Sequence, residues 1–100
     1  MQSYYAEQFE REMGCTEAEW LGWLPGAIGA HAWQHEGTSA KVRFGEAETL
    51  VVCWRGIEPR VIAMVRIPRL LVRFRFTGVD EQRRYAFMKR FDLYMQRGGG

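Results

Sequence analysis

The residues whose spacing comes nearest to a chemical motif are two histidines, His31 and His35, with Glu36 directly after them. Side chains four residues apart share a face on a helix and also on a strand, so both imidazoles could approach one ion. A zinc site needs a third or fourth ligand, and the metalloprotease motif has a glutamate where this chain has Ala32. His31 and His35 are therefore only weak metal candidates, and we expect neither a metal nor another cofactor.

Cysteine and carboxylate chemistry has no stronger support. Cys53 lies between Val52 and Trp54 in an apolar segment, which favours a packing role over that of a nucleophile. Asp92 lies beside the apolar stripe of the expected C-terminal helix, between Phe91 and Leu93, and an ion pair with Lys89 on the same helix would explain it. The Gly-x-Ser-x-Gly and phosphate-loop patterns are absent. The sequence therefore does not favour an enzyme, although missing motifs leave that question open.

Charge is distributed unevenly along the chain. Residues 1–50 carry eight acidic and three basic side chains, whereas residues 51–100 carry four acidic and eleven basic ones. Every basic residue except Lys41 and Lys89 is an arginine. This is typical of GC-rich bacterial genomes, but the planar guanidinium also matches carboxylate and phosphate groups. The basic half of the chain is therefore the place to look for an interaction surface.

The segment 69–77 alternates most clearly between two kinds of side chain, as a half-buried strand does. Its apolar face consists of Leu70, Val72, Phe74 and Phe76. A second basic stripe is expected on the C-terminal helix, where three arginines recur every seven residues. The predicted binding surface joins the outward side of the strand to this stripe and comprises Arg69, Leu71, Arg73, Arg75, Arg83, Arg90 and Arg97.

Three roles for this arginine surface remain open. It could be a protein interface, most simply that of a homodimer, with arginines facing the acidic N-terminal half of the partner. It could bind nucleic acid, although the outward positions lack the aromatic residues of a single-strand platform. The arginines could also pair within the chain, with glutamates such as Glu7, Glu10, Glu17 and Glu19.

The first third of the chain is expected to form two helices. Tyr5, Phe9 and Met13 recur every four residues and predict a helix over residues 3–13. Thr16 and Glu19 have the spacing of a capping box, which predicts a second helix over residues 17–24. The pair Pro25-Gly26 is expected to end that helix.

The rest of the chain favours strands followed by one helix. Residues 30–35 are ambiguous between a strand paired to residues 39–44 and a helical turn, and we favour the strand. Strands are then expected over 39–44, 50–55, 60–66 and 69–77, with a loop at 56–59 and an interruption at Pro68. An apolar stripe predicts a helix over residues 80–97, formed by Phe87, Met88, Phe91, Tyr94 and Met95.

Short turns between strands imply an antiparallel meander. We expect an α+β fold of order α-α-β-β-β-β-α, with one antiparallel sheet of four or five strands and the helices on one face. Residues 1–97 form a single domain and residues 98–100 a flexible tail. No apolar run of about 20 residues and no signal peptide is evident, so we expect a cytoplasmic protein without membrane contact, whose Cys15 and Cys53 stay reduced.

The sequence thus predicts a small non-enzymatic bacterial protein that acts through protein contact. It would associate with itself through the arginine and apolar side of the sheet. Binding of nucleic acid by that side and by the helix stripe is the alternative. The biological process, the partner and the oligomeric state do not follow from the sequence.

Overall fold

The computed structural model describes residues 4–99, apart from the side chains of residues 97–99, and it is built around two long antiparallel strands. The elements in chain order are β1 (Gln8–Met13), α1 (Glu17–Ile28), β2 (Trp33–Glu36), β3 (Ser39–Arg43), β4 (Thr49–Ile62), β5 (Val65–Thr77) and α2 (Glu81–Gly99). The five strands form one antiparallel sheet in the order β1-β5-β4-β3-β2. The expected α+β fold with a single antiparallel sheet is therefore confirmed.

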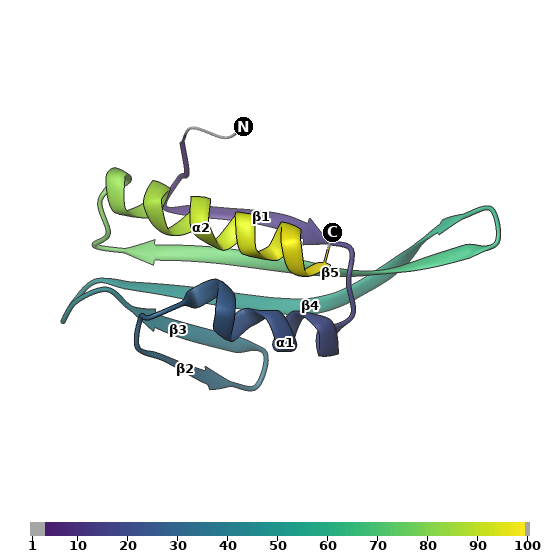
Figure 1. Cartoon of the computed structure of the whole chain (residues 1–100), viewed down its shortest axis with the longest axis horizontal. Coiled ribbons are helices and arrows are strands. Elements are labelled where there is room, and N and C mark those ends of the chain that lie inside the picture. The colour runs from purple at the N-terminus through teal and green to yellow at the C-terminus, as the bar shows by residue number, and fades with distance from the viewer. Residues whose placement is uncertain (1–3, 100) are drawn as a thin grey trace.

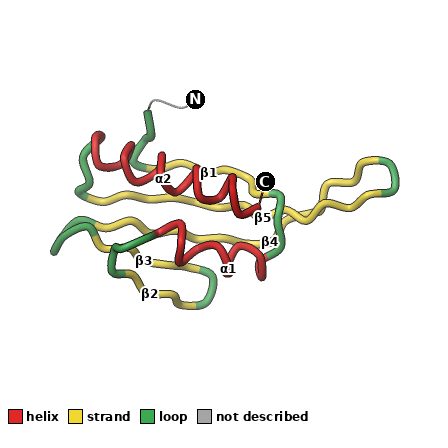
Figure 2. Tube along the Cα trace, viewed as in Figure 1, coloured by secondary structure: helices red, strands yellow, loops and turns green. Residues whose placement is uncertain are grey.

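Both helices cover the same face of the sheet (Figure 1), which makes a two-layer molecule. In Figure 2, α2 lies along β1 and β5, and α1 lies along β4 and β3. The inward side chains of β5 are buried as expected, because alternate residues of a strand point to opposite faces. The core that they form with the two helices includes Leu50, Val52, Trp54, Leu70, Val72, Phe74, Phe76, Trp20, Leu24, Phe87, Met88 and Phe91.

The segment predicted to be the first helix is instead an edge strand. Residues 8–13 pair with β5, and Phe9, Arg11 and Met13 point toward the helices. A spacing of four residues is even, so Tyr5, Phe9 and Met13 fit one face of a strand as well as one face of a helix. The alternation of apolar and polar residues was not recognised in the sequence, because the charged Arg11 occupies an inward position between two apolar residues. The order of elements is therefore β-α-β-β-β-β-α.

Helix α1 begins as predicted and ends later. The Thr16 hydroxyl accepts from the Glu19 amide at 3.1 Å, and the Glu19 carboxylate accepts from the Thr16 amide at 2.9 Å. The helix continues past Pro25 to Ile28, because Ala27 and Ile28 are buried in the core.

Carbonyl groups at the end of α1 are bound by an arginine of α2. The Arg90 guanidinium donates to the carbonyls of Gly26 and Ala27 at 3.1 and 2.9 Å. Gly29 follows the helix with a φ of 78°, and a Cβ there would collide with the same guanidinium. Arg90 therefore acts as a C-terminal cap supplied from another element.

Removing this cap should destabilise the fold. Arg90→Met keeps the aliphatic stem and leaves two helix carbonyls without their charged donor, so we expect the free energy of unfolding to fall by about 1–2 kcal/mol. Urea denaturation measures this. Arg75→Met is the matched control, since Arg75 is exposed without a partner among the described residues, and it should change stability by less than about 0.5 kcal/mol. Equal losses in both variants would contradict the capping role.

The ambiguous segment before β3 is a strand, as favoured from the sequence. β2 pairs with β3 through the turn at Gly37, whose φ is 59°. Between β4 and β5 the expected loop was wrong, because residues 56–59 belong to β4. The register does break at Pro68, between the pairs Ile57–Arg69 and Arg60–Ile67, but β5 continues through it. The two strands pair from Thr49 to Ile62, with a β-bulge between Ile57 and Arg60.

Prolines are tolerated in this hairpin because of where they lie. Pro59 is within the bulge, and the register places Pro68 on the other strand opposite that bulge. Neither proline belongs to a hydrogen-bonded pair of the ladder. Proline lacks an amide hydrogen and is found in sheets at edges and bulges, so it costs little here.

The outer part of the hairpin projects from the body as a two-stranded arm, residues 57–69 (Figure 1). β3 flanks β4 only from Thr49 to Cys53, and β1 flanks β5 only from Leu70 to Arg75, so the arm has no neighbouring strand among the described residues. It contributes to a longest dimension of 47 Å. The tip turns at Ala63, which adopts a φ of 54°, a region that favours glycine.

Helix α2 follows the predicted pattern. Phe87, Met88, Phe91 and Met95 are buried, whereas Tyr94 is 39% exposed. The helix runs to Gly99 rather than residue 97, and Gly100 lies outside the described residues, so the flexible tail stays a prediction. Within the described part of the chain, no helix is long and apolar enough to cross a membrane.

Candidate functional site

The face of the sheet that points away from both helices, here the outer face, carries the first group of predicted binding residues. Arg69, Leu71, Arg73 and Arg75 all project from it, as expected, because their neighbours in β5 are buried on the opposite side. The strand register sets Arg73 beside Cys53, and Arg75 beside Val51. Cys53 is exposed rather than packed, so the expected packing role for its side chain is wrong.

Two of the outer-face arginines are neutralised within the chain. Arg73 pairs with Glu10, and Arg69 pairs with Glu12 at 2.9 Å and also donates to the Glu58 carbonyl at 2.8 Å. Both glutamates come from β1, which the strand register places beside β5. The Glu10 pair is among those that intrachain pairing suggested, while Glu12 was not foreseen. Such exposed pairs contribute about 0–1 kcal/mol each.

Other cations have no partner, and their location is systematic. Among the described side chains, six exposed basic groups form no ion pair, hydrogen bond or cation–π contact with the rest of the chain. Four project from the outer face and two from the arm; they are Lys41, Arg43, Arg55 and Arg75, and Arg60 and Arg66. Of the strand residues described on the outer face, Glu36 is the one carboxylate without such a partner. Free positive charge is thus concentrated on the outer face and the arm.

A shallow hollow of about 470 Å³ opens on the outer face between β1, β5 and β4. Val51 and Cys53 lie beneath it, and Arg73 and Arg75 stand at its side with Gln8 and Glu10. The hollow brings together an apolar floor, the Arg73–Glu10 ion pair and the Arg75 guanidinium, which has no partner among the described residues.

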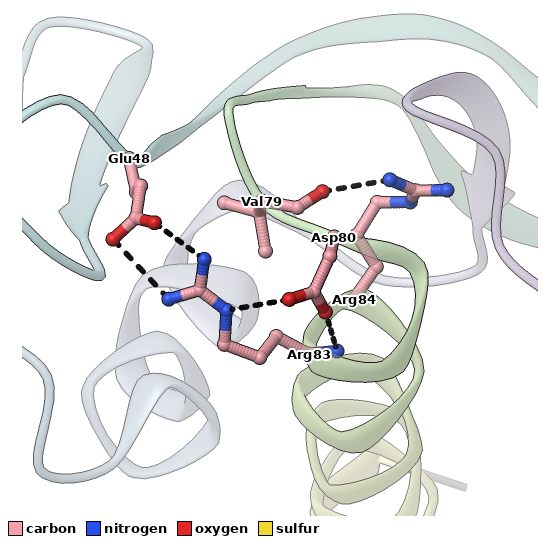
Figure 3. Close-up of polar contacts among 5 residues, drawn as sticks. All are labelled: Glu48, Val79, Asp80, Arg83 and Arg84. Atoms are coloured by element: carbon pink, nitrogen blue, oxygen red, sulfur yellow. Dashed lines mark hydrogen bonds and ion pairs between the residues drawn. The ribbon is translucent and has the colours of Figure 1, made fainter.

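The helix stripe predicted as the second part of the binding surface is engaged inside the molecule. Arg83 bridges the Glu48 and Asp80 carboxylates, with contacts of 3.2 Å to Glu48 Oε1 and 3.4 Å to Asp80 Oδ2 (Figure 3). Glu48 directly precedes β4 and Asp80 precedes α2, so Arg83 ties the start of the helix to the sheet. Arg90 caps α1, and the side chain of Arg97 lies outside the described residues.

Arg83 also sets the charge state of its partners. Its side-chain hydrogen bonds hold the pKa of the Glu48 carboxyl below its usual value. The backbone amide of Arg83, which donates to Asp80 at 2.8 Å, is the main cause that lowers the pKa of Asp80. Both carboxylates are therefore ionised at neutral pH, and the bridge stays formed.

Arg84 is a buried cation that the sequence did not single out. Its side chain is 7% exposed, and it donates to the carbonyl of Tyr5 at 2.9 Å. It also donates to the carbonyl of Val79 at 2.7 Å (Figure 3). These bonds fasten the segment before β1 to the start of α2. An arginine at this position of an amphipathic helix is expected to be exposed, so the sequence did not indicate that Arg84 is buried.

Asp92 takes part in a small network instead of the expected pair with Lys89. It accepts from the Tyr5 hydroxyl at 2.7 Å and pairs with Arg11, whose guanidinium lies over the Phe9 ring. Lys89 instead faces the Tyr85 ring. Burial raises the pKa of Tyr5 to about 12, and the hydrogen bond to Asp92 adds to this shift. The network joins α2 to β1 and holds the tyrosine neutral, which suits a structural role.

This shift predicts a loss of stability in alkali. The unfolded chain releases the Tyr5 proton near pH 10, while the folded protein keeps it to about pH 12, so the free energy of unfolding falls as pH rises between these values. The contribution lost is about 2 kcal/mol. Urea denaturation from pH 8 to 12 should show a shallower fall for Tyr5→Phe than for the wild type. Tyr94→Phe should behave like the wild type, and identical slopes for all three proteins would refute the assignment.

The histidines do not converge on a common site. His31 packs on the Phe44 ring, with 4.7 Å between centroids, whereas the His35 Nε2 is 2.7 Å from the Gly37 carbonyl. In the described part of the chain, no three histidine, cysteine or acidic side chains are close enough to hold a metal ion.

The sequence did not reveal the arm, because residues 56–59 were expected to form a loop and residues 60–66 a separate strand. Val61, Ile62 and Val65 are 54–59% exposed, and Met64 at the tip is 98% exposed. The apolar run around the turn was the available signal.

Comparison with protein-family models, curated proteins and solved structures finds no match to this chain.

Proposed function

We propose that the protein acts through protein contact and associates with a second copy of itself through the arm and the adjoining part of the outer face. The supporting observation is the apolar tip. Val61, Ile62, Met64 and Val65 are each more than half exposed, although the chain has a core in which to bury such residues. Soluble monomers rarely expose apolar side chains together in this way, and such clusters mark interaction sites.

The form of the arm favours contact through side chains over addition of a strand. Both backbone edges of the arm lack a neighbouring strand among the described residues, which would otherwise make them templates for pairing. However, Pro59 and Pro68 cannot donate hydrogen bonds, and the bulge at 57–60 distorts the edge. Prolines, bulges and charges are the usual means of blocking such pairing.

The tip alone is too small for a stable dimer interface, so the contact must include neighbouring residues. A stable interface buries about 800 Å² on each partner, more than a few side chains supply. Ile57 and Ile67 at the base of the arm, and Leu71 on the outer face, are half-buried apolar residues that continue the surface. The contact therefore includes the part of the arginine and apolar face nearest the arm.

A second copy suits this surface because the arm carries both signs of charge. Arg60, Arg66 and the Glu58 carboxylate have no ionic partner among the described residues. In a two-fold symmetric contact the same residues meet from both sides, so Glu58 of each chain can face an arginine of the other. Glu58→Arg should therefore weaken association.

The experiment is analytical ultracentrifugation at about 10–100 μM protein, with variants that place charge at the tip. We expect a dimer for the wild type. The dissociation constant of the dimer should rise at least about tenfold for Ile62→Asp with Met64→Asp, which shifts the protein to the monomer, because burying a carboxylate is costly. Leu93→Asp on α2 is the matched control, since Leu93 is 47% exposed on the helix side, and it should remain dimeric.

Circular dichroism distinguishes a variant that has lost the interface from one that has lost its fold. The tip side chains are exposed, so the monomeric form of the tip variant should keep its secondary structure by circular dichroism. A wild-type protein that stays monomeric across this concentration range would overturn the proposal. So would equal effects of the tip and Leu93 substitutions.

A further inference from the structure

We infer that the half of the outer face away from the arm binds the phosphate backbone of double-stranded nucleic acid. The residues concerned are three of the outer-face cations without a partner among the described residues, here the basic patch: Lys41, Arg43 and Arg75. By contrast, the described cations on the helix side are engaged with carboxylates, carbonyls or an aromatic ring; they are Arg11, Arg83, Arg84, Lys89 and Arg90. One side of the molecule is thus left with positive charge that no described group neutralises.

The sheet fixes the spacing of these charges. Lys41 and Arg75 both pair with Val51 from opposite sides, so they lie two strand spacings apart, about 10 Å. Arg43 follows Lys41 by two residues, about 7 Å along the same strand. Duplex DNA carries one negative charge per about 1.7 Å of axis, so a patch of this size faces several phosphates at once.

The neutral neighbours of the basic patch are also of the kind that contacts phosphate. The register sets Gln34 beside Lys41 and Gln8 beside Arg75, while Thr49 lies beside Arg43. Amide and hydroxyl groups, together with arginine and lysine, make most of the hydrogen bonds that proteins form with the sugar–phosphate backbone.

A duplex explains the composition of this face better than other anionic partners do. No aromatic side chain projects from the outer positions of the five strands, so the stacking that holds single strands is missing. The centre of a protein interface is depleted of charge, whereas this region has Val51 as its main apolar residue. A second copy is disfavoured here, since the same cations would face each other.

The test uses a 20-base-pair duplex labelled with a fluorophore, titrated at about 50 to 300 mM salt. Binding should weaken steeply with salt, and the slope of log K against log salt should drop by about 0.9 for each cation lost, roughly 3 in the triple variant Lys41→Gln, Arg43→Gln and Arg75→Gln. Because these side chains have no partner among residues 4–96, whose side chains the structure describes, the variant should keep the wild-type circular dichroism spectrum and thermal midpoint.

Single substitutions give the matched comparison. Lys41→Gln should weaken binding and lower the slope, whereas Lys89→Gln, which removes the same charge from the helix side, should leave the slope unchanged. The inference is overturned if the wild type does not bind at about 50 mM salt, or if both lysine variants weaken binding equally. The inference is also overturned if an oligo-thymidine strand displaces the labelled duplex as well as unlabelled duplex does, since this would point to single strands. Displacement by poly-glutamate to the same extent would point to an acidic protein and would overturn it too.

This surface is separate from the one proposed for self-association. Ile62→Asp with Met64→Asp should still bind the duplex, because the substituted residues lie at the tip of the arm. If the tip variant loses dimerisation and still binds the duplex, the inference stands without the proposed self-association. If the triple variant loses duplex binding and still dimerises, the two surfaces are shown to be independent.

Discussion

Backbone hydrogen bonds between β4 and β5 hold together the two longest strands, and the other elements take their places around this pair. β3 adds to the free edge of β4, and β1 adds to the free edge of β5. Inward side chains of the pair, such as Val52, Val72 and Phe74, supply the floor on which both helices pack. Because the pair is longer than its neighbours, its remainder becomes the arm.

Covering only one face of the sheet divides the charges of the molecule into two groups. Polar groups covered by the helices lose water and need partners, which is why the buried Arg84 binds carbonyls and the partly buried Arg11 binds a carboxylate. Cations on the outer face keep their hydration and need no internal partner. The same constraint that completes the core therefore leaves basic groups available to other molecules.

The sequence allowed the interior of the sheet to be predicted because alternation in β5 is unbroken from Leu70 to Phe76. It failed at β1, where Arg11 occupies an inward position that only its contacts with Asp92 and Phe74 make tolerable. It failed at the arm because Pro59 and Pro68 resemble breaks unless their position at a bulge is known.

The candidate surface was partly predictable for the same reasons. The outward direction of Arg69, Arg73 and Arg75 followed from alternation alone. Which of them are free depends on contacts between distant segments, since Glu10 and Glu12 reach β5 only when β1 is a strand. The helix stripe was expected to be open, and the engagement of Arg83 with Glu48 required the tertiary structure.

The pairing of β1 with β5 has a consequence for the order in which the protein folds. β4 and β5 are joined by a two-residue turn, so their hairpin closes locally and fast, whereas β1 must find a strand from the far end of the chain. During synthesis β1 leaves the ribosome first and yet has nothing to pair with until β5 has emerged. Until β1 pairs with β5, Arg69 and Arg73 lack their glutamates, so the sheet without β1 is more basic than the finished one.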